Sequence, residues 1–114
     1  MATKIKISKK DGKLVGLSAQ GHTGFGEYGS DILCACVSSI IQTAGLGIRE
    51  LVCKDVILNI CEKTPKFEII LPQNLSSTQY PQAELILKTA IVGLEDLQSG
   101  YPKNIKMEVK NDVY

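Results

Sequence analysis

The sequence predicts an α+β protein in which two helices cover one face of a five-stranded mixed sheet, giving a two-layer sandwich. Five short segments alternate apolar and polar residues or carry short apolar runs, which is typical of strands. Two longer segments repeat apolar residues at intervals of three and four, which is typical of helices. Along the chain these segments give the order ββαββαβ. One sheet face is enough to bury the apolar stripes of both helices.

The first two strands are predicted to form a β-hairpin. Residues 4–8 alternate polar and apolar side chains, and residues 14–18 form a second apolar run. Between them, Asp11-Gly12 is a strong sequence for a two-residue turn. The hairpin is expected to end near Ala19.

A glycine-rich loop then leads into the first helix. Its glycines stand at positions 21, 24, 26 and 29. Ser30 or Asp31 is a suitable N-cap, and apolar residues recur at helical spacing from there, so a helix is expected over about residues 31–52. Gly45 and Gly47 each cost about 1 kcal/mol relative to alanine inside a helix. They predict either a break or, as we prefer, a close approach of another backbone, within the fold or across a dimer.

The second half of the chain repeats the pattern of two strands and a helix and then adds a final strand. Strands are predicted at residues 56–60 and 66–71, around a turn that contains Lys63-Thr64-Pro65. Pro81 suits a first helical turn, and Gly100 and Pro102 end that helix. Its expected buried face consists of Ala83, Leu87, Ala90, Leu94 and Leu97. Residues 105–109 alternate again and predict the fifth strand.

Length and composition limit the classes of function. The 114 residues predict a single domain, 1–114, and thirteen basic against twelve acidic residues give a formal charge of +1. No direct nucleic-acid binding is therefore expected from net charge, although a local basic patch could form. No run approaches about 18 consecutive apolar residues and no signal peptide is evident, so a cytoplasmic protein without a membrane partner is expected. Four cysteines without a dense framework spacing are expected to be reduced thiols.

The candidate chemistry lies between His22 and Cys34. With Asp31 as N-cap, Cys34 falls in the first helical turn, where free N–H groups and the helix dipole favour a thiolate. His22 on the loop could serve as general base and acid, and the free N–H groups could stabilise an oxyanion. The alternatives are that Cys34 is a small core residue and that His22 is a loop histidine without a role.

Other residues of the same stretch are expected to support this pair. Ser38, one turn beyond Cys34, could line the pocket or simply bond back to a helix carbonyl. Asp31 could orient His22, but capping requires only local geometry and is favoured. The glycines would let the loop open and close over an extended peptide, with Phe25 and Tyr28 as apolar contacts.

Neither a metal nor a cofactor is expected. Cys34 and Cys36 lie about 200° apart around a helix, so they cannot readily share a metal ion. The distant Cys53 and Cys61 do not complete the paired spacing of a structural zinc site. The glycines form no dinucleotide-binding fingerprint, and no Walker lysine follows them.

The stretch from Gly21 to Ser38 resembles the ribosomal processing cysteine proteases of the Prp family. Members carry Gly-His, a glycine-containing loop, then Gly-x-Asp-Ile-x-Cys-Ala and a later serine. Here these are Gly21-His22, Gly29-Ser30-Asp31-Ile32-Leu33-Cys34-Ala35 and Ser38. The resemblance extends over the whole chain in length and element order.

The resemblance implies a homodimeric endopeptidase with His22 and Cys34 as a catalytic dyad and no metal. Its substrate would be the N-terminal extension of the twenty-seventh large-subunit ribosomal protein, with apolar and aromatic residues beside the cut. Phe25 and Tyr28 agree with such a substrate. Two alternatives stay open: a non-catalytic, ribosome-associated peptide-binding protein, and a thiol redox sensor based on Cys34.

Overall fold

The elements follow one another in the predicted order, ββαββαβ, in a computed structural model that describes residues 3–21, 27–61 and 66–111, with residues 27–31 described by their backbone alone. The strands are β1 (Thr3–Lys10), β2 (Lys13–Gln20), β3 (Ile57–Cys61), β4 (Lys66–Ile70) and β5 (Ile105–Asn111), and the helices are α1 (Glu27–Leu51) and α2 (Gln79–Gly100). All seven predicted elements are therefore confirmed, with shifted ends for several of them.

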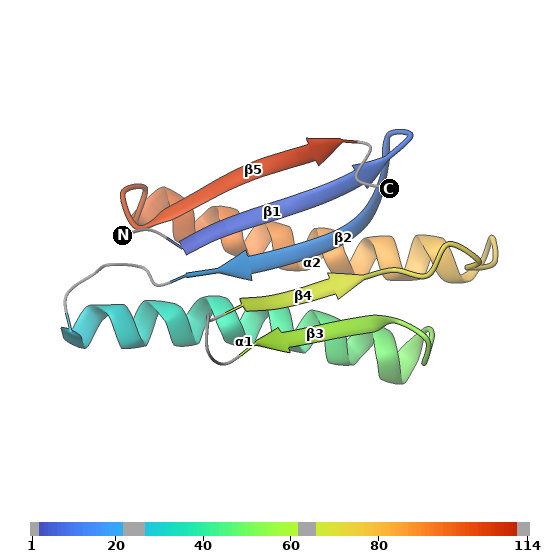
Figure 1. The fold of residues 1–114 in the computed structure, drawn as a ribbon, viewed down its shortest axis with the longest axis horizontal. Coiled ribbons are helices and arrows are strands. Elements are labelled where there is room, and N and C mark those ends of the chain that lie inside the picture. The colour runs from blue at the N-terminus through green and yellow to red at the C-terminus, as the bar shows by residue number, and fades with distance from the viewer. Residues whose placement is uncertain (1–2, 22–26, 62–65, 112–114) are drawn as a thin grey trace.

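The five strands form one mixed sheet in the order β3-β4-β2-β1-β5. Strand β1 pairs antiparallel with β2 and parallel with β5, and β4 pairs antiparallel with both β2 and β3. Both helices lie on the same side of the sheet, with α1 behind β3 and β4 and α2 behind β1 and β5 (Figure 1). This arrangement confirms the two-layer sandwich and leaves the other sheet face without a covering layer.

The tight turn between β1 and β2 is the predicted one. Asp11 and Gly12 both have positive φ angles, 51° and 77°, as a two-residue type I′ hairpin turn requires. The register of the hairpin shifts once, between Ser8 and Lys9. Aspartate and glycine tolerate the left-handed region, so this local sequence is sufficient to fix the turn.

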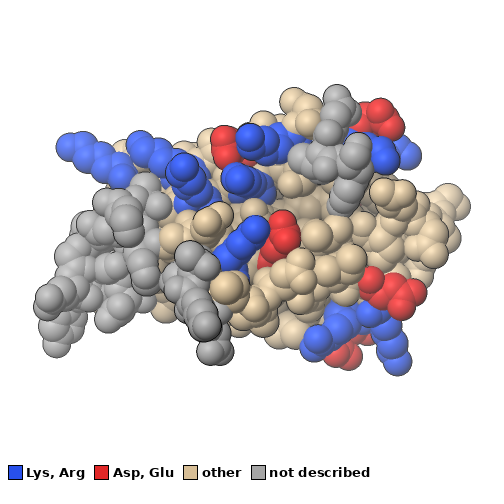
Figure 2. Space-filling model, in the orientation of Figure 1, with Lys and Arg blue, Asp and Glu red and all other residues tan. Residues whose placement is uncertain are grey.

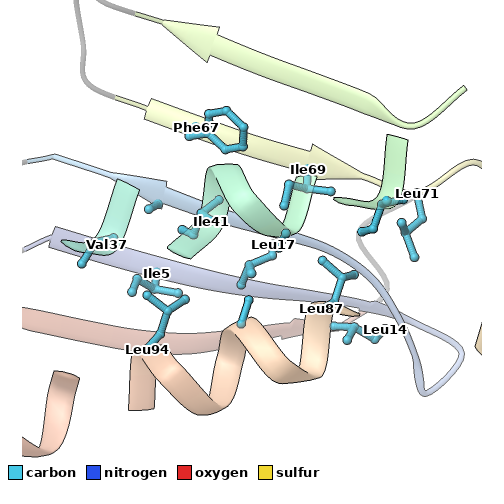
Figure 3. Close-up of a cluster of buried hydrophobic side chains, with 14 of the residues drawn as sticks. Ile5, Leu14, Leu17, Val37, Ile41, Phe67, Ile69, Leu71, Leu87 and Leu94 are labelled. Carbon is cyan, nitrogen blue, oxygen red and sulfur yellow. The ribbon is translucent and has the colours of Figure 1, made fainter. Parts of the chain in front are cut away.

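The core lies between the sheet and the helix layer. Alternation places Ile5, Leu17 and Ile69 on the helix-facing side of β1, β2 and β4, and each is at most 1% exposed. Helices α1 and α2 oppose them with apolar stripes at helical spacing (Figure 3). The side chains of these stripes that are buried are Leu33, Val37, Ile41, Ala44 and Ile48 of α1, and Ala83, Leu87, Ala90 and Leu94 of α2.

Helix α1 begins four residues before the predicted N-cap, and this part of the prediction is wrong. It starts at Glu27, so Ser30 and Asp31 lie inside the helix and neither caps it. The prediction gave weight to Gly29 and to the capping preference of serine and aspartate. A single glycine costs only about 1 kcal/mol in a helix, which a helix packed along a sheet can offset.

The two glycines in the middle of α1 have different surroundings. A Cβ atom on Gly45 would lie 2.8 Å from Leu58 Cδ2 and 3.3 Å from Ile69 Cγ1. The predicted close packing is thus confirmed at Gly45, and its partners are side chains of β3 and β4 rather than another backbone. A Cβ atom on Gly47 would meet nothing within 4 Å among the described residues, so that glycine faces open space.

Helix α2 begins at Gln79, so Pro81 lies in its first turn as predicted. Ala83, Leu87, Ala90 and Leu94 form its buried face, as expected, and Leu97 is partly buried against the same core. The helix ends at Gly100, and the N–H of Tyr101 donates to the carbonyls of Leu97 and Gln98. Pro102 follows, where it cannot continue the helix.

The segment Ile32–Leu51 of α1 is unusually apolar for a surface helix. This 20-residue segment has a mean hydropathy of 1.5 and is only 33% buried. By length and composition alone it could cross a membrane. A core helix of a soluble protein passes the same test, and five side chains of α1 do lie in the core. The prediction counted uninterrupted apolar residues, and polar residues such as Ser38, Gln42 and Thr43 interrupt this run.

Candidate active site

Cys34 lies on α1, seven residues after Glu27 and therefore about two turns from the start of the helix. Only the first four N–H groups of a helix lack an intrahelical partner, and the effect of the dipole falls off within the first turn. The prediction that Cys34 occupies the first turn is thus wrong. Helix-terminal N–H groups and the dipole act on residues 27–30 instead. Any activation of the Cys34 thiol must then come from a neighbouring side chain.

The helix holds Cys34 at the rim of the core. Leu33 and Val37, on either side of it, are 4% and 2% exposed and anchor this part of α1 on the sheet. Cys34 itself is half-buried, whereas Cys36 is exposed. The backbone under Cys34 is therefore fixed by core packing while the side chain keeps contact with solvent, an arrangement that suits a nucleophile.

Ser38 lies one helical turn beyond Cys34 and is also half-buried. Residues four apart in a helix are neighbours on the same face. Of the seven residues predicted for the site, Cys34 and Ser38 are the two that the structure brings together through described side chains. Ser38 can therefore line any pocket that forms over Cys34.

Gly21 ends the described part of the chain after β2. It has a φ of 90°, a left-handed conformation that L side chains rarely adopt, and it is half-buried. The conformation explains why glycine stands immediately before His22. The end of β2, which Gly21 follows, and the start of α1 lie at the same end of the molecule (Figure 1).

The remaining predicted site residues are not described at the side-chain level. His22 and Phe25 lie outside the described residues, and Tyr28 and Asp31 are described only as part of the α1 backbone. The structure therefore gives no distance between the imidazole of His22 and the thiol of Cys34. Their expected roles rest on the sequence pattern.

The other cysteines do not assemble with Cys34. Cys36 is exposed, Cys53 follows α1, and Cys61 ends β3, and none of the four cysteines is in a disulfide. Within residues 3–21, 27–61 and 66–111, no three side chains of His, Cys, Asp or Glu come together to hold a metal ion.

Tyr80, a residue whose pKa is raised by its surroundings, lies at the other end of the molecule. Its hydroxyl donates to the carbonyl of Leu14 at 2.9 Å and lies 3.3 Å from Glu84 Oε2. Burial raises the pKa of Tyr80, and the charge of Glu84 raises it further. Because Tyr80 starts α2 and Cys34 is near the start of α1, at opposite ends in Figure 1, we assign Tyr80 a structural role.

Comparison with known sequences places this pattern in a family. Residues 2–106 match the family described as Cysteine protease Prp. A curated relative from Staphylococcus aureus, the ribosomal processing cysteine protease Prp, is 30% identical over 100 residues, which cover 88% of this chain and 91% of the relative.

Comparison with solved structures also finds a protease of this family. A crystal structure of the S. aureus ribosomal processing protease Prp, in complex with a covalently linked product peptide, has a TM-score of 0.79 at 29% identity and covers 95% of this chain and 99% of that one. A protein from Streptococcus mutans has a TM-score of 0.81 at 22% identity, with 96% and 95% coverage, which shows the shared fold.

Proposed function

This chain belongs to the Prp family of cysteine proteases, and on that premise we propose that it is a ribosomal processing endopeptidase with Cys34 as nucleophile. The observation that carries the proposal is the position of Cys34, half-buried on a helix turn that Leu33 and Val37 anchor in the core. His22 is proposed as general base and acid. Gly21, through its left-handed backbone, sets the direction in which the chain enters His22.

The proposed reaction needs only these two side chains and water. His22 takes the proton of the Cys34 thiol, and the thiolate attacks the carbonyl carbon of the scissile peptide bond. The tetrahedral intermediate collapses to a thioester as His22 protonates the leaving amine. Water, deprotonated by His22, then hydrolyses the thioester to a carboxylate and restores the thiol. The S. aureus relative, with its covalently linked product peptide, supports a mechanism through a covalent intermediate.

We propose the N-terminal extension of the twenty-seventh large-subunit ribosomal protein as the substrate, cleaved in the cytoplasm. Phe25 and Tyr28 would contact its apolar and aromatic residues beside the cut. Ser38 would line the pocket over Cys34, and Asp31, which the helix start excludes as an N-cap, would support His22. The family, the name of the S. aureus relative and the sequence pattern from Gly21 to Ser38 support this assignment.

A cleavage assay tests the catalytic roles. A synthetic peptide that spans the extension and the first residues of the mature ribosomal protein should be cut by the wild type and left intact by Cys34→Ala and by His22→Ala. Cys36→Ala is the matched control, because it removes an exposed thiol from the same helix and should cleave at close to the wild-type rate. Cleavage by Cys34→Ala at the wild-type rate would show that another residue is the nucleophile.

Thiol labelling separates the enzyme from a peptide-binding protein. Exposure alone would make Cys36 react before Cys34, because Cys36 is exposed and Cys34 is half-buried. An activated thiolate reverses this order, so the proposal expects iodoacetamide at neutral pH to label Cys34 first, with His22→Ala abolishing the preference. Labelling in order of exposure would favour the non-catalytic binding protein. Peroxide sensitivity of Cys34 without peptide cleavage would favour the redox sensor.

We propose further that the protein is a homodimer joined through its helix layer. The outer surface of α1 and α2 exposes Leu51 (79%), Leu85 (67%) and Val92 (65%), beside a groove that runs between the helices past Gly47 and Gly93. Large exposed apolar patches mark interaction sites, and an apolar patch is complementary to its own copy across a twofold axis. The described residues that line the groove carry no charged side chain, so a second copy packed there would bury no ion in it.

Sedimentation at micromolar concentration tests the dimer. The wild type should sediment as a dimer, and Leu51→Glu combined with Val92→Glu should produce monomers with an unchanged far-UV circular dichroism spectrum, since both side chains are exposed. Ile57→Glu combined with Val109→Glu is the control, because it makes the same two changes at half-exposed positions on β3 and β5, outside the helix layer. A monomeric wild type, or equal dissociation by the control, would refute the interface.

A further inference from the structure

The sheet face opposite the helices is rich in lysine side chains. Side chains alternate along strands, so the neighbours of buried Ile5 on β1, Lys4 and Lys6, point to this uncovered face. The strand pairing extends the same face to Lys66 of β4 and to Lys106 and Lys110 of β5. Lysine side chains gather over these strands in the space-filling view (Figure 2).

Three of these lysines line up across the sheet. Lys106 pairs in register with Lys4, Lys4 with Gln20, and Gln20 with Lys66. We call Lys106, Lys4, Gln20 and Lys66 the lysine row. Neighbouring strands are about 4.8 Å apart, so the row places three cations over four adjacent strands without an acidic residue between them.

The face as a whole is basic although the chain is almost neutral. Its five lysines, at positions 4, 6, 66, 106 and 110, are opposed by two glutamates, Glu68 and Glu108, which gives the face +3. The full sequence has a formal charge of +1, so the remainder of the chain carries −2. A local basic patch is therefore present on this face, although the net charge of the whole chain is close to zero.

The lysine row is electrostatically unfavourable in the isolated protein. Like charges directly opposite each other on neighbouring strands destabilise a sheet, and Lys4 and Lys106 are such a pair. Among the described residues, the ion pair on this face joins Lys66 to Glu68, with 4.0 Å between Nζ and Oε2. Lys106 Nζ also donates to the carbonyl of Pro102 at 3.0 Å. A bound polyanion would relieve the repulsion.

Polar groups surround a shallow hollow beside the row. The polar and charged residues that line the hollow are Lys6, Ser8, Ser18, Gln20, Lys66, Lys110 and one carboxylate, Glu68. Hydroxyl and amide groups between cations can donate hydrogen bonds to phosphate and sugar oxygens. The residues that point to this face, in the described strands, include no aromatic side chain on which a base could stack.

The lysine row also lies at the functional end of the molecule. Gln20 is the last residue of β2, and the end of β2 lies at the same end of the molecule as the start of α1 (Figure 1). A ligand on the row would therefore lie on the outer sheet face at the same end of the protein as Cys34.

We propose that this face binds the phosphate backbone of RNA without sequence preference. Cations repeated across several strands match the repeated charges of a nucleic acid. A membrane would instead need several apolar anchors beside the cations. Among the large exposed apolar side chains of the described residues, this face carries only Ile57, at the β3 edge and 47% exposed, whereas Leu51, Leu85 and Val92 lie on the opposite, helical layer. The proposal stands apart from the protease assignment, because none of the residues of the row is placed in the catalytic machinery.

Fluorescence anisotropy with a labelled oligouridylate tests this proposal. The test variant is Lys4→Gln, Lys66→Gln and Lys106→Gln combined. The control is Lys54→Gln, Lys88→Gln and Lys103→Gln combined, which removes the same charge from exposed positions outside the sheet. At about 50 mM KCl the test variant should bind at least tenfold more weakly than wild type, and the slope of log K against log salt should fall in magnitude by about 2, because each lost phosphate contact contributes roughly 0.7. The control should stay within about twofold.

Four outcomes would overturn the proposal. These are no binding by the wild type at low salt, an equal loss in the control variant, competition by poly-glutamate as strong as by unlabelled RNA, and binding to phosphatidylserine vesicles in preference to RNA. Circular dichroism of both variants verifies that they fold. Peptide cleavage measured alongside keeps the two proposals separate, since the test variant should retain it even if RNA binding fails.

Discussion

At the scale of single residues, the environment distinguishes cysteines that composition cannot. Cys34 and Cys36 are two positions apart on α1, yet one is half-buried beside core residues and the other is exposed. Core packing by Leu33 and Val37 fixes the backbone under Cys34. A nucleophile on a rigid element needs less reorganisation than one on a loop, so this packing supports the role that we propose for Cys34.

Tyr80 gives a prediction for the dependence of stability on pH. Burial, together with the charge of Glu84, raises its pKa above the ordinary value of about 10, so the folded state holds the phenol proton more tightly than the unfolded chain does. The stability from this group is fully present below about pH 10 and is lost as pH rises through the raised folded pKa. Tyr80→Phe should be less stable than wild type by about 1 kcal/mol below pH 10, because it loses the hydrogen bond to Leu14.

Urea unfolding at several pH values, with absorbance at the tyrosinate band, measures this effect. The difference in unfolding free energy between wild type and Tyr80→Phe should shrink above pH 10. A difference that stays constant or grows with pH would mean that the folded protein does not retain the proton.

At the scale of elements, α1 contributes residues to the core, to the candidate site and to the outer surface of the helix layer. Leu33, Val37 and Ile41 face the core, Cys34 lies near its first turns, and Leu51 points outward from its last turn. This combination explains why the segment is apolar enough to resemble a membrane span while only 33% of it is buried. The apolar residues that the core does not use are those for which we propose a second copy.

The two glycines of α1 are expected to respond to alanine with opposite signs. Gly47→Ala should stabilise by up to about 1 kcal/mol, because the added methyl meets open space and alanine favours the helix. Gly45→Ala should destabilise by on the order of 1 kcal/mol, since its methyl presses on Leu58 and on fully buried Ile69.

Thermal unfolding in the background that combines Leu51→Glu with Val92→Glu, which removes the contribution of association, compares the two variants. If Gly45→Ala were as stabilising as Gly47→Ala, the contact between α1 and the sheet would be looser than the structure shows.

At the scale of the whole molecule, the central strands of the sheet are hydrogen-bonded to more neighbouring strands than the edge strands are. Strands β1, β2 and β4 are each paired on both sides. Among the described residues, the edge strands β3 and β5 each pair with one strand, and β3 is the shorter of the two, with five residues against seven and most of its side chains exposed. The central strands also carry Ile5 and Leu17, which lie at the middle of the core (Figure 3).

Hydrogen exchange should follow this order. Amides of β1 and β2 should exchange slowest, through opening of the whole domain, and those of β3 should exchange fastest among the strands, through local opening. Mass spectrometry of peptides from each strand measures the rates. Protection of β3 equal to that of β1 would indicate that a partner covers this edge in solution.

The sequence by itself determined the order of the elements, the turn at Asp11 and Gly12, and the buried face of the second helix. These features depend on residues close together in the chain, so periodicity and turn chemistry report them directly. The sequence also singled out Cys34, because a glycine-rich loop with the one histidine precedes its helix.

Only the tertiary structure decided the strand order, the parallel pairing of β5 with β1, and the start of α1 at Glu27. The start of a helix depends on packing as well as on capping preference, which is why the N-cap prediction at Asp31 was wrong. The lysine row also could not be predicted from the sequence, because it depends on long-range packing. Lys4, Lys66 and Lys106 are separated by tens of residues, and each alone looks like an ordinary polar position on a strand. Long-range strand pairing brings them together, and no local pattern encodes the partner of a strand.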